Sequence, residues 1–273
     1  MNEIWIAVLI VTAIGLVAGI GLAIASAVMA VPKDEKAEAV LEVLPGANCG
    51  ACGYSGCSGY AAALSKGEAK AGLCSPGGAE VAAAIAKVLG TEPVGVEYKT
   101  ALVHCMGSHD NTQDKMRYQG QPSCAAAAQF FGGVAACPYG CMGLGDCAAV
   151  CEYSAITVCN GVASINPAKC RGCSKCVAAC PKHLISFVPL KSQAVVRCSN
   201  CDKGGETRKI CKTGCIGCMR CVKACESGAV QVKNFLASVD PQKCTNCGKC
   251  AEVCPQHCIS LADFSAYAGE KAE

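Results

Sequence analysis

The sequence predicts an α+β protein in which one transmembrane helix precedes a small N-terminal iron–sulfur domain and two duplicated ferredoxin-like modules. Three observations predict this fold class. The chain opens with a long apolar run, it contains 27 cysteines among 273 residues, and one cysteine-rich unit occurs twice. Cysteine at about one residue in ten is far above ordinary usage. The spacing of these cysteines therefore carries most of the functional information.

The first predicted element is a membrane anchor over residues 1–31. Residues 4–30 form an uncharged apolar run, which as a helix would reach about 40 Å at about 1.5 Å per residue and span a bilayer with some tilt. A cleavable signal peptide would have a basic start and a shorter apolar region, whereas this chain begins Met-Asn-Glu. Because thiols at this density would oxidise outside the cell, we expect a single-pass protein of the inner or cytoplasmic membrane with its cysteine-rich body in the cytoplasm.

Residues 32–100 are predicted to form the N-terminal iron–sulfur domain around the segment "NCGACGYSGC". Its cysteines follow the pattern C-x2-C-x4-C-x16-C and are Cys49, Cys52, Cys57 and Cys74. The glycines between them allow the loop to approach a metal and to direct backbone N–H groups at the sulfurs. Four thiolates without histidine favour a 4Fe–4S cluster, with zinc as the alternative. Residues 79–90 are expected to form a helix packed on this site.

The rest of the chain is largely one unit that occurs twice. Residues 124–187 align with residues 198–261 at a constant shift of 74 positions, and the cysteine pattern repeats between the two copies. We therefore predict a first module at 101–187, a second at 188–262 and a C-terminal tail at 263–273. Within each copy, β-branched stretches before Asn160-Gly161 and Asn234 predict small β-hairpins.

The cysteine spacing in these modules is that of bacterial two-cluster ferredoxins. The run C-x2-C-x2-C-x3-C occurs at residues 170–180, 215–225 and 244–254. In such runs the first three cysteines hold one 4Fe–4S cluster, and the fourth ligates the other cluster. Disulfide frameworks belong to small secreted domains, and zinc needs only C-x2-C pairs. The spacing therefore favours iron–sulfur clusters.

The crossing of the fourth cysteine assigns two ligand sets to each module. In the second module the sets are Cys215, Cys218, Cys221 and Cys254, and Cys225, Cys244, Cys247 and Cys250. In the first module Leu144 stands opposite Cys218, so we take Cys137 as the replacement ligand. The expected sets there are Cys137, Cys141, Cys147 and Cys180, and Cys151, Cys170, Cys173 and Cys176. A damaged or three-iron site is the alternative for the first of these sets.

Five sites of four ligands use 20 of the 27 cysteines and leave seven. We expect a sixth cluster with the ligands Cys105, Cys124, Cys198 and Cys211. Cys201 is the substitute ligand in this hypothesis, and free buried thiols are the alternative to the cluster itself. His104 and His109 flank Cys105, and either could replace a thiolate there. Cys159 and Cys258 are interpreted as structural.

The carboxy-terminal part of the chain is basic. Residues 165–255 contain 15 Lys and Arg against five Asp and Glu, a formal charge of +10. An oxidised 4Fe–4S core with four thiolates carries a net charge of roughly −2, so many of these cations are expected to neutralise clusters. The others could dock a soluble acidic carrier, most of all at residues 203–209 and Lys212. Nucleic-acid binding is not expected, because no aromatic platforms accompany the basic residues.

No sequence pattern for a substrate-converting site is present. The chain has no G-x-G-x-x-G after a strand and no P-loop, and the apolar span holds no ionisable residue that would mark an ion path. We therefore expect an electron carrier with no catalytic residues and no direct nucleotide binding.

The whole sequence resembles the B subunits of the Rnf family, the ion-translocating ferredoxin:NAD+ oxidoreductases of bacteria and archaea. The resemblance rests on the single span, on "LPGANCGACGYSGC" with Cys74 downstream, and on "CPYGCMGLGDCAAVC" with the paired ferredoxin motifs. It implies a protein that accepts electrons from reduced soluble ferredoxin and relays them to membrane subunits, where transfer to NAD+ drives Na+ or H+ export. A polyferredoxin subunit of another membrane oxidoreductase and a zinc-stabilised membrane scaffold are the alternative interpretations.

Overall fold

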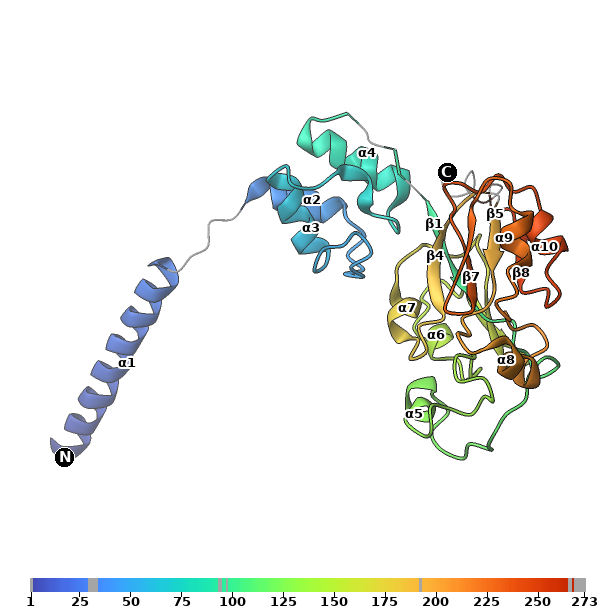
Figure 1. Cartoon of the computed structure of the whole chain (residues 1–273). Helices are drawn as coiled ribbons and strands as arrows, with labels where there is room; N and C mark the ends of the chain where they lie inside the picture. Colours follow the sequence, from blue (N-terminus) through green and yellow to red (C-terminus); the bar gives the residue numbers. More distant parts are fainter. Residues whose placement is uncertain are drawn as a thin grey trace.

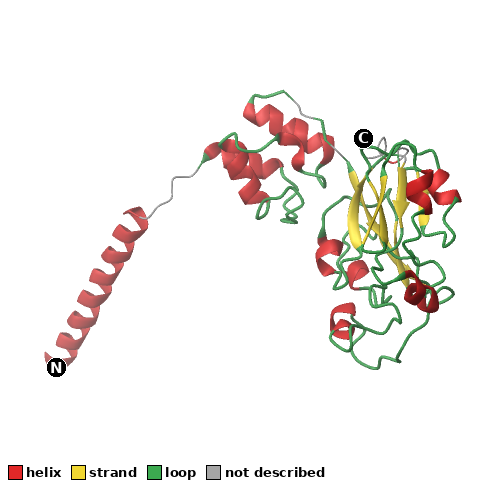
Figure 2. Ribbon diagram, in the orientation of Figure 1, coloured by secondary structure: helices red, strands yellow, loops and turns green. Residues whose placement is uncertain are grey.

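The computed structural model of the chain describes residues 2–28, 34–92, 95–96, 98–191, 193–264 and 267. It combines helices and short strands, and Figure 2 shows that the strands belong to the carboxy-terminal modules. Helix α1 (Asn2–Val28) contains the predicted span. Its segment Ile4–Ser26 is the one helix of the described residues that is long and apolar enough to cross a membrane. The last predicted anchor residues, 29–31, lie outside the described residues.

The N-terminal domain is helical. Its elements are α2 (Glu35–Val43), α3 (Cys57–Ser65), the 3-10 helix η1 (Ala71–Leu73) and α4 (Gly78–Leu89). Helix α2 begins after Asp34, whose carboxylate accepts hydrogen bonds from two backbone N–H groups of the first turn. The helix predicted at 79–90 is confirmed as α4, and Ile85 of this helix lies fully buried in one core with Tyr60 and Cys74. The apolar core of the domain therefore lies directly behind the cysteine loop.

Each ferredoxin-like module consists of two antiparallel strand pairs joined by segments that carry short helices. In the first module β1 (Lys99–Val103) pairs with β4 (Ile185–Pro189), and β2 (Ile156–Cys159) pairs with β3 (Val162–Ile165). The helices are α5 (Cys124–Ala128), α6 (Asp146–Ala149) and α7 (Lys175–Ala179). Because the first strand pairs with the last, the two ends of the module lie side by side. This outer pair extends slightly beyond the predicted range 101–187.

The second module repeats this topology. Strand β5 (Gln193–Val196) pairs with β8 (Ile259–Ala262), and β6 (Val230–Lys233) pairs with β7 (Leu236–Val239). Its helices are α8 (Gly204–Ile210), α9 (Arg220–Ala224) and α10 (Lys249–Glu252). Equivalent surface ion pairs also recur, Lys175 with Glu152 and Lys249 with Glu226. Topology and ion pairs therefore both follow the duplication seen in the sequence.

The predicted hairpins are confirmed in both modules. Asn160 and Gly161 have φ values of +49° and +78°, and Asn234 and Phe235 have +49° and +60°. Two successive positive φ values are the signature of a two-residue hairpin turn of type I′. The first cysteine loop packs closely on this turn, because a Cβ at Gly143 would lie 2.6 Å from the carbonyl oxygen of Gly161. This contact therefore sets the distance between the cysteine loop and the hairpin turn.

The two modules differ in the segment that follows their first strand. From Cys105 to Cys141 this segment is about twice as long as the equivalent segment from Cys198 to Cys215. The extra residues of this segment in the first module include helix α5. Figure 1 shows this helix at the opposite end of the module from the C-terminus of the chain. This insertion changes which cysteines come together in the first module.

The two modules pack against each other along their strands. Figure 1 shows β1, β4 and β5 between helix α7 of the first module and helices α9 and α10 of the second. Leu102 of β1, Val195 of β5 and Phe264 form a shared apolar cluster. A hydrogen bond also crosses between the modules at the strand ends, where Arg197 Nε donates to Val103 O at 3.0 Å. The pair of modules therefore forms one connected body.

Candidate metal centres

All 27 cysteines lie in the part of the chain that the structure describes, and none of them forms a disulfide. Many are buried, and burial raises the pKa of Cys147 to about 12 and the pKa values of Cys176 and Cys221 to about 11. A buried thiol with such a pKa stays protonated unless a metal replaces the proton. Among the described residues no three His, Cys, Asp or Glu side chains come close enough to hold a single metal ion. Three groups of these cysteines instead line cavities.

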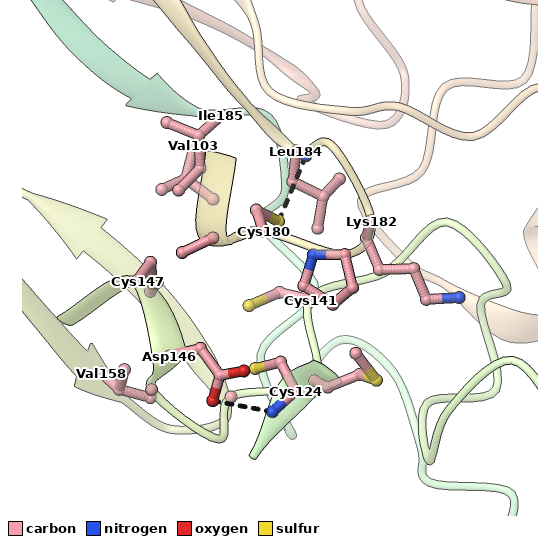
Figure 3. Close-up of a pocket in the computed structure, with 16 residues that line it drawn as sticks. Val103, Cys124, Cys141, Asp146, Cys147, Val158, Cys180, Lys182, Leu184 and Ile185 are labelled. Carbon is pink, nitrogen blue, oxygen red and sulfur yellow. Dashed lines mark hydrogen bonds between the residues drawn. The ribbon is translucent and has the colours of Figure 1, made fainter. Parts of the chain in front are cut away.

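The first cavity lies in the first module and is shown in Figure 3. Its cysteines are Cys124, Cys141, Cys147 and Cys180. Apolar side chains of Val103, Val158 and Ile185 complete its wall, and the Sγ atom of Cys180 accepts a hydrogen bond from the N–H of Leu184 at 3.5 Å. Four thiols, an apolar wall and a backbone N–H donor to sulfur are the features that a 4Fe–4S site needs.

The position of Cys124 differs from the expectation based on sequence, which gave this place to Cys137. Cys137 does not line the first cavity, and Cys124 reaches it because the insertion of the first module folds back as helix α5. The motif has Leu144 where the second module has a cysteine, so the fourth thiol of this cavity comes from another segment of the chain. In the second module Cys218 lies in the corresponding cavity and comes from the motif itself.

Asp146 holds the start of helix α5 in place. Its carboxylate accepts hydrogen bonds from the N–H groups of Cys124 and Ala125 and from the hydroxyl of Ser123, each at 2.9 Å. Although partial burial acts in the opposite direction, these three donors keep the pKa of Asp146 below its ordinary value. An ionised carboxylate thus ties the inserted helix to the first turn of α6 (Figure 3). Sequence reasoning missed this residue, because the repeat has Arg220 at the same position.

The second cysteine group of the first module is Cys151, Cys170, Cys173 and Cys176. Cys170 and Cys176 belong to the buried core, and Cys151 packs against it. Backbone N–H groups again face the sulfurs: Ala101 donates to Cys170 and Ala155 donates to Cys151, both at 3.4 Å. Burial raises the pKa of Cys173. A Cβ at the preceding Gly172 would lie 3.3 Å from the Cβ of Ser75, the residue after Cys74, so the N-terminal cysteine group lies next to this one.

The second module has a cavity that corresponds to the first. Its lining includes Cys215, Cys218, Cys221 and Cys254 together with Cys258. Cys258 is fully buried, and its sulfur lies 3.6 Å from that of Cys254. Either sulfur can donate in this hydrogen bond, which lowers the pKa of Cys254 to about 5. Hydrogen bonds with Cys215 and Cys254 raise the pKa of Cys258. The first module has Leu184 at this position, which makes the S–H donor specific to the second module.

The last cysteine group of the second module is Cys225, Cys244, Cys247 and Cys250. Cys250 is part of the buried core, with Cys225 and Cys244 packed against it. Cys247, in contrast, is exposed. This group therefore lies at the surface of the second module.

The N-terminal group is formed by Cys49, Cys52, Cys57 and Cys74. Cys74 is buried, and Cys52 and Cys57 pack against the same core. The loop is closed by Asn48, whose side-chain oxygen accepts the N–H of Cys57 at 2.9 Å. Gly56 has a φ of +132°, and a Cβ there would lie 2.9 Å from this oxygen. The glycine is thus required for the loop to fold around its cysteines.

The remaining thiols include a further set around one cavity. Cys137 lies there with Cys105, Cys198 and Cys211, between the two modules. Cys124, expected here from the sequence, lines the first cavity instead. Cys201 does not line this cavity, and Cys159 is exposed. His104 does line it, but both of its ring nitrogens are engaged, Nδ1 with Val196 O at 2.7 Å and Nε2 with Ser186 Oγ at 2.6 Å.

Comparison with protein families agrees with this geometry. A family model described as "Putative Fe-S cluster" matches residues 44–76, and a "4Fe-4S dicluster domain" matches residues 169–229 and 214–258. The second of the dicluster matches lies within the second module, and the first joins a motif of the first module with a motif of the second.

Curated relatives match nearly the whole chain. The chain is 42% identical over 261 residues to the B subunit of the Na(+)-translocating ferredoxin:NAD(+) oxidoreductase complex of Acetobacterium woodii, covering 95% of this chain and 78% of the relative. It is 38% identical over 263 residues to the B subunit of the proton-translocating ferredoxin:NAD(+) oxidoreductase complex of Clostridium ljungdahlii, covering 95% and 93%. It is 36% identical over 253 residues to the B subunit of the ion-translocating oxidoreductase complex of Methanosarcina acetivorans, covering 92% and 96%. The chain therefore belongs to the family of B subunits of the ion-translocating Rnf oxidoreductase complexes.

Proposed function

We propose that this chain accepts electrons from a reduced soluble ferredoxin and relays them to membrane subunits of an ion-translocating ferredoxin:NAD+ oxidoreductase. The names of the relatives from Acetobacterium woodii and Clostridium ljungdahlii support the reaction and the complex. The observation that carries the relay is the spatial succession of cysteine groups from the N-terminal loop to the far side of the second module. Bound 4Fe–4S clusters would supply one-electron transfer, and the protein residues hold, space and insulate them.

Two of the proposed ligand sets line cavities, and the other three follow the cysteine motifs. Five clusters are assigned to Cys49, Cys52, Cys57 and Cys74; to Cys151, Cys170, Cys173 and Cys176; to Cys124, Cys141, Cys147 and Cys180; to Cys215, Cys218, Cys221 and Cys254; and to Cys225, Cys244, Cys247 and Cys250. Cys124 replaces Cys137 in this assignment because it lines the cavity with the other three thiols. The proposed domain division is the anchor at 1–31, the N-terminal domain at 32–100, the modules at 101–187 and 188–262, and the tail at 263–273.

The proposed succession is supported by contacts between neighbouring groups. Ser75, the residue after Cys74, lies beside the first module, because a Cβ at Gly172 would lie 3.3 Å from its Cβ. Cys147 and Cys176, from the two groups of the first module, pack in one buried core. In the second module the members of both motif groups pack in a single core. The N-terminal group therefore adjoins the first module, and the two groups within each module adjoin each other, as a relay requires within these parts of the chain.

We assign the docking of ferredoxin to the second module. A surface groove there is lined by Arg220, Lys223 and His257 beside the ligand Cys254, with Glu252 as its acidic member. Cys218 and Cys247 are exposed, so two clusters of this module would lie near the surface. Soluble ferredoxins are acidic carriers in this proposal, and basic side chains around exposed clusters would attract and orient them.

The other end of the relay is the N-terminal domain, which directly follows the apolar helix in the chain. We propose that this domain delivers electrons to membrane partners and that the cysteine-rich body lies on the cytoplasmic side of the cytoplasmic membrane. The absence of disulfides among the 27 described cysteines supports that side. No catalytic residue is assigned to the chain, and its contribution to the oxidoreductase is electron transfer.

The experiment that tests this function is anaerobic purification of the full chain, followed by titration with reduced ferredoxin. Iron and acid-labile sulfide are measured first, and paramagnetic resonance then follows reduction of the clusters. The proposal expects about 20 or more irons per chain, at four irons per cluster, and reduction by ferredoxin within the mixing time. Zinc in place of iron, or an iron-loaded protein that ferredoxin does not reduce, would contradict it.

A further inference from the structure

The cavity between the two modules contains a set of thiols that the five motif-based sites do not use. Cys105 and Cys137 come from the first module, and Cys198 and Cys211 come from the second. Cys105 and Cys211 are buried, and the other two are half-buried. Two modules thus contribute two cysteines each to one enclosed space.

The four cysteines are related by the same approximate symmetry as the modules. Cys105 and Cys198 each lie two residues after the first strand of their module, and Cys137 and Cys211 each lie four residues before Cys141 and Cys215. The sequence alignment pairs Cys124 with Cys198, but the strands pair Cys105 with Cys198. The cavity therefore lies where the two halves of the duplicated body meet.

The hydrogen bonds to sulfur repeat in the same way. Cys105 Sγ accepts N–H groups from Gly107 at 3.3 Å and from Cys141 at 3.4 Å. Cys198 Sγ accepts N–H groups from Asn200 at 3.4 Å and from Cys215 at 3.3 Å. Two N–H donors aimed at one sulfur stabilise a thiolate better than a neutral thiol, which accepts hydrogen bonds weakly.

Asn200 adds a donor from a buried side chain. Its side chain is 2% exposed, and Nδ2 donates to Cys137 Sγ at 3.3 Å. The orientation of the amide is fixed, because Oδ1 accepts the N–H of Asp202 at 2.7 Å and lies 3.2 Å from the hydroxyl of Thr207. The buried amide is therefore held with its NH2 group facing the sulfur of Cys137.

The wall of the cavity also carries a positive charge. Arg197 lines the cavity. Among the hydrogen bonds between described residues its guanidinium donates one, from Nε to Val103 O at 3.0 Å. An oxidised 4Fe–4S core with four thiolates has a net charge of roughly −2, which this cation would offset. None of the residues that line this cavity is an Asp or Glu that would offset the guanidinium if the thiols were neutral.

We infer that Cys105, Cys137, Cys198 and Cys211 hold a sixth 4Fe–4S cluster at the boundary between the two modules. This inference rests on the proposed function, because it extends the same relay. The site connects the modules directly: Cys105 accepts the N–H of Cys141, a proposed ligand in the first module, and Cys198 accepts that of Cys215, a proposed ligand in the second. It therefore closes the gap between the two pairs of clusters.

The test compares iron and sulfide content in the full chain and in two double variants. The wild-type protein is expected to contain about 24 irons, at four per cluster. Cys105→Ala with Cys198→Ala removes one ligand from each module and is expected to lower this to about 20. The matched control, Cys159→Ala with Cys201→Ala, also removes two cysteines, but neither lines the cavity, and it should retain the wild-type content.

The outcomes test the sixth site and the proposed function separately. A wild-type content of about 20 irons that the first double variant does not change overturns the sixth site and leaves the proposed function intact. A protein without iron overturns both. If the double variant fails to fold, Asn200→Ala is used instead, since it keeps all four thiols. The midpoint potential of one cluster should then fall with the iron content unchanged, and unchanged potentials for all clusters would overturn the assignment.

Discussion

At the scale of single residues, the first and second modules differ in the segment of the chain that supplies one of the proposed ligands. The motif loop of the second module supplies Cys218, whereas Leu144 at the same repeat position has no sulfur. The structure compensates with Cys124 from an insertion that Asp146 ties to the motif. The position of the proposed ligand Cys124 thus depends on the carboxylate of Asp146, which is not itself a proposed ligand.

Asp146→Asn is therefore expected to reduce occupancy of the cluster assigned to Cys124, Cys141, Cys147 and Cys180. The amide presents one acceptor oxygen where the carboxylate uses two for three donors, so helix α5 should lose about 1–3 kcal/mol of anchoring. Iron analysis should show up to about four irons fewer per chain. Glu42→Gln, on an exposed position of α2, is the matched control, and equal iron contents in both variants would contradict the anchoring role.

Cys258 supports a second prediction for a single residue. Because a ligating Cys254 thiolate carries no proton, the Cys258 thiol 3.6 Å away is the donor of this pair, and it should stabilise the reduced, more negative state of the cluster proposed for Cys254. Cys258→Leu copies the first module, which has Leu184 at this position. The midpoint potential of one cluster should fall by roughly 40 mV, the one-electron equivalent of about 1 kcal/mol. Redox titration monitored by paramagnetic resonance measures it, and an unchanged or raised potential would refute the donor role.

At the scale of elements, helix α9 presents the basic groove of the second module. Arg220 and Lys223 are exposed on this short helix beside Cys254. Reversing both charges (Arg220→Glu, Lys223→Glu) should slow reduction by ferredoxin about tenfold at low ionic strength, and the difference should shrink as salt is added. Stopped-flow reduction over a range of salt concentrations measures this. Lys66→Glu with Lys70→Glu in the N-terminal domain is the control with the same change of net charge, and equal rates for both double variants would move the docking site elsewhere.

The elements that the sequence predicted best are those with local signals. The hairpins at Asn160 and Asn234 and the helix at 79–90 each follow from turn residues or from apolar periodicity within a short window. The exchange of Cys124 and Cys137 could not be found from motif spacing, because it depends on the long-range folding of an insertion. One signal did exist. The repeat aligns Cys137 with Cys211, and since Cys211 is not needed in the second module, its partner should not be needed in the first.

At the scale of the whole molecule, the domains differ in what their cores are made of. The N-terminal core contains large apolar side chains such as Val40, Tyr60 and Ile85. The cores of both modules consist largely of cysteines with small or medium apolar residues such as Ala101, Ala163 and Ala237. Little apolar area is available in the modules to offset chain entropy, so the metal clusters must supply much of the folding free energy there.

Removal of iron should therefore unfold the two modules and leave the N-terminal helices largely folded. Without clusters, the buried thiols of each module would face one another across empty space, and the strand pairs have too small a core to persist alone. Limited proteolysis after anaerobic chelation should cut throughout residues 99–262, while a fragment containing α2, α3 and α4 resists for longer because Val40, Tyr60 and Ile85 still pack together. The untreated holoprotein, which should resist in both regions, is the control. Modules that remain resistant after chelation would mean that their cores are stable without metal, and the clusters would then serve electron transfer alone.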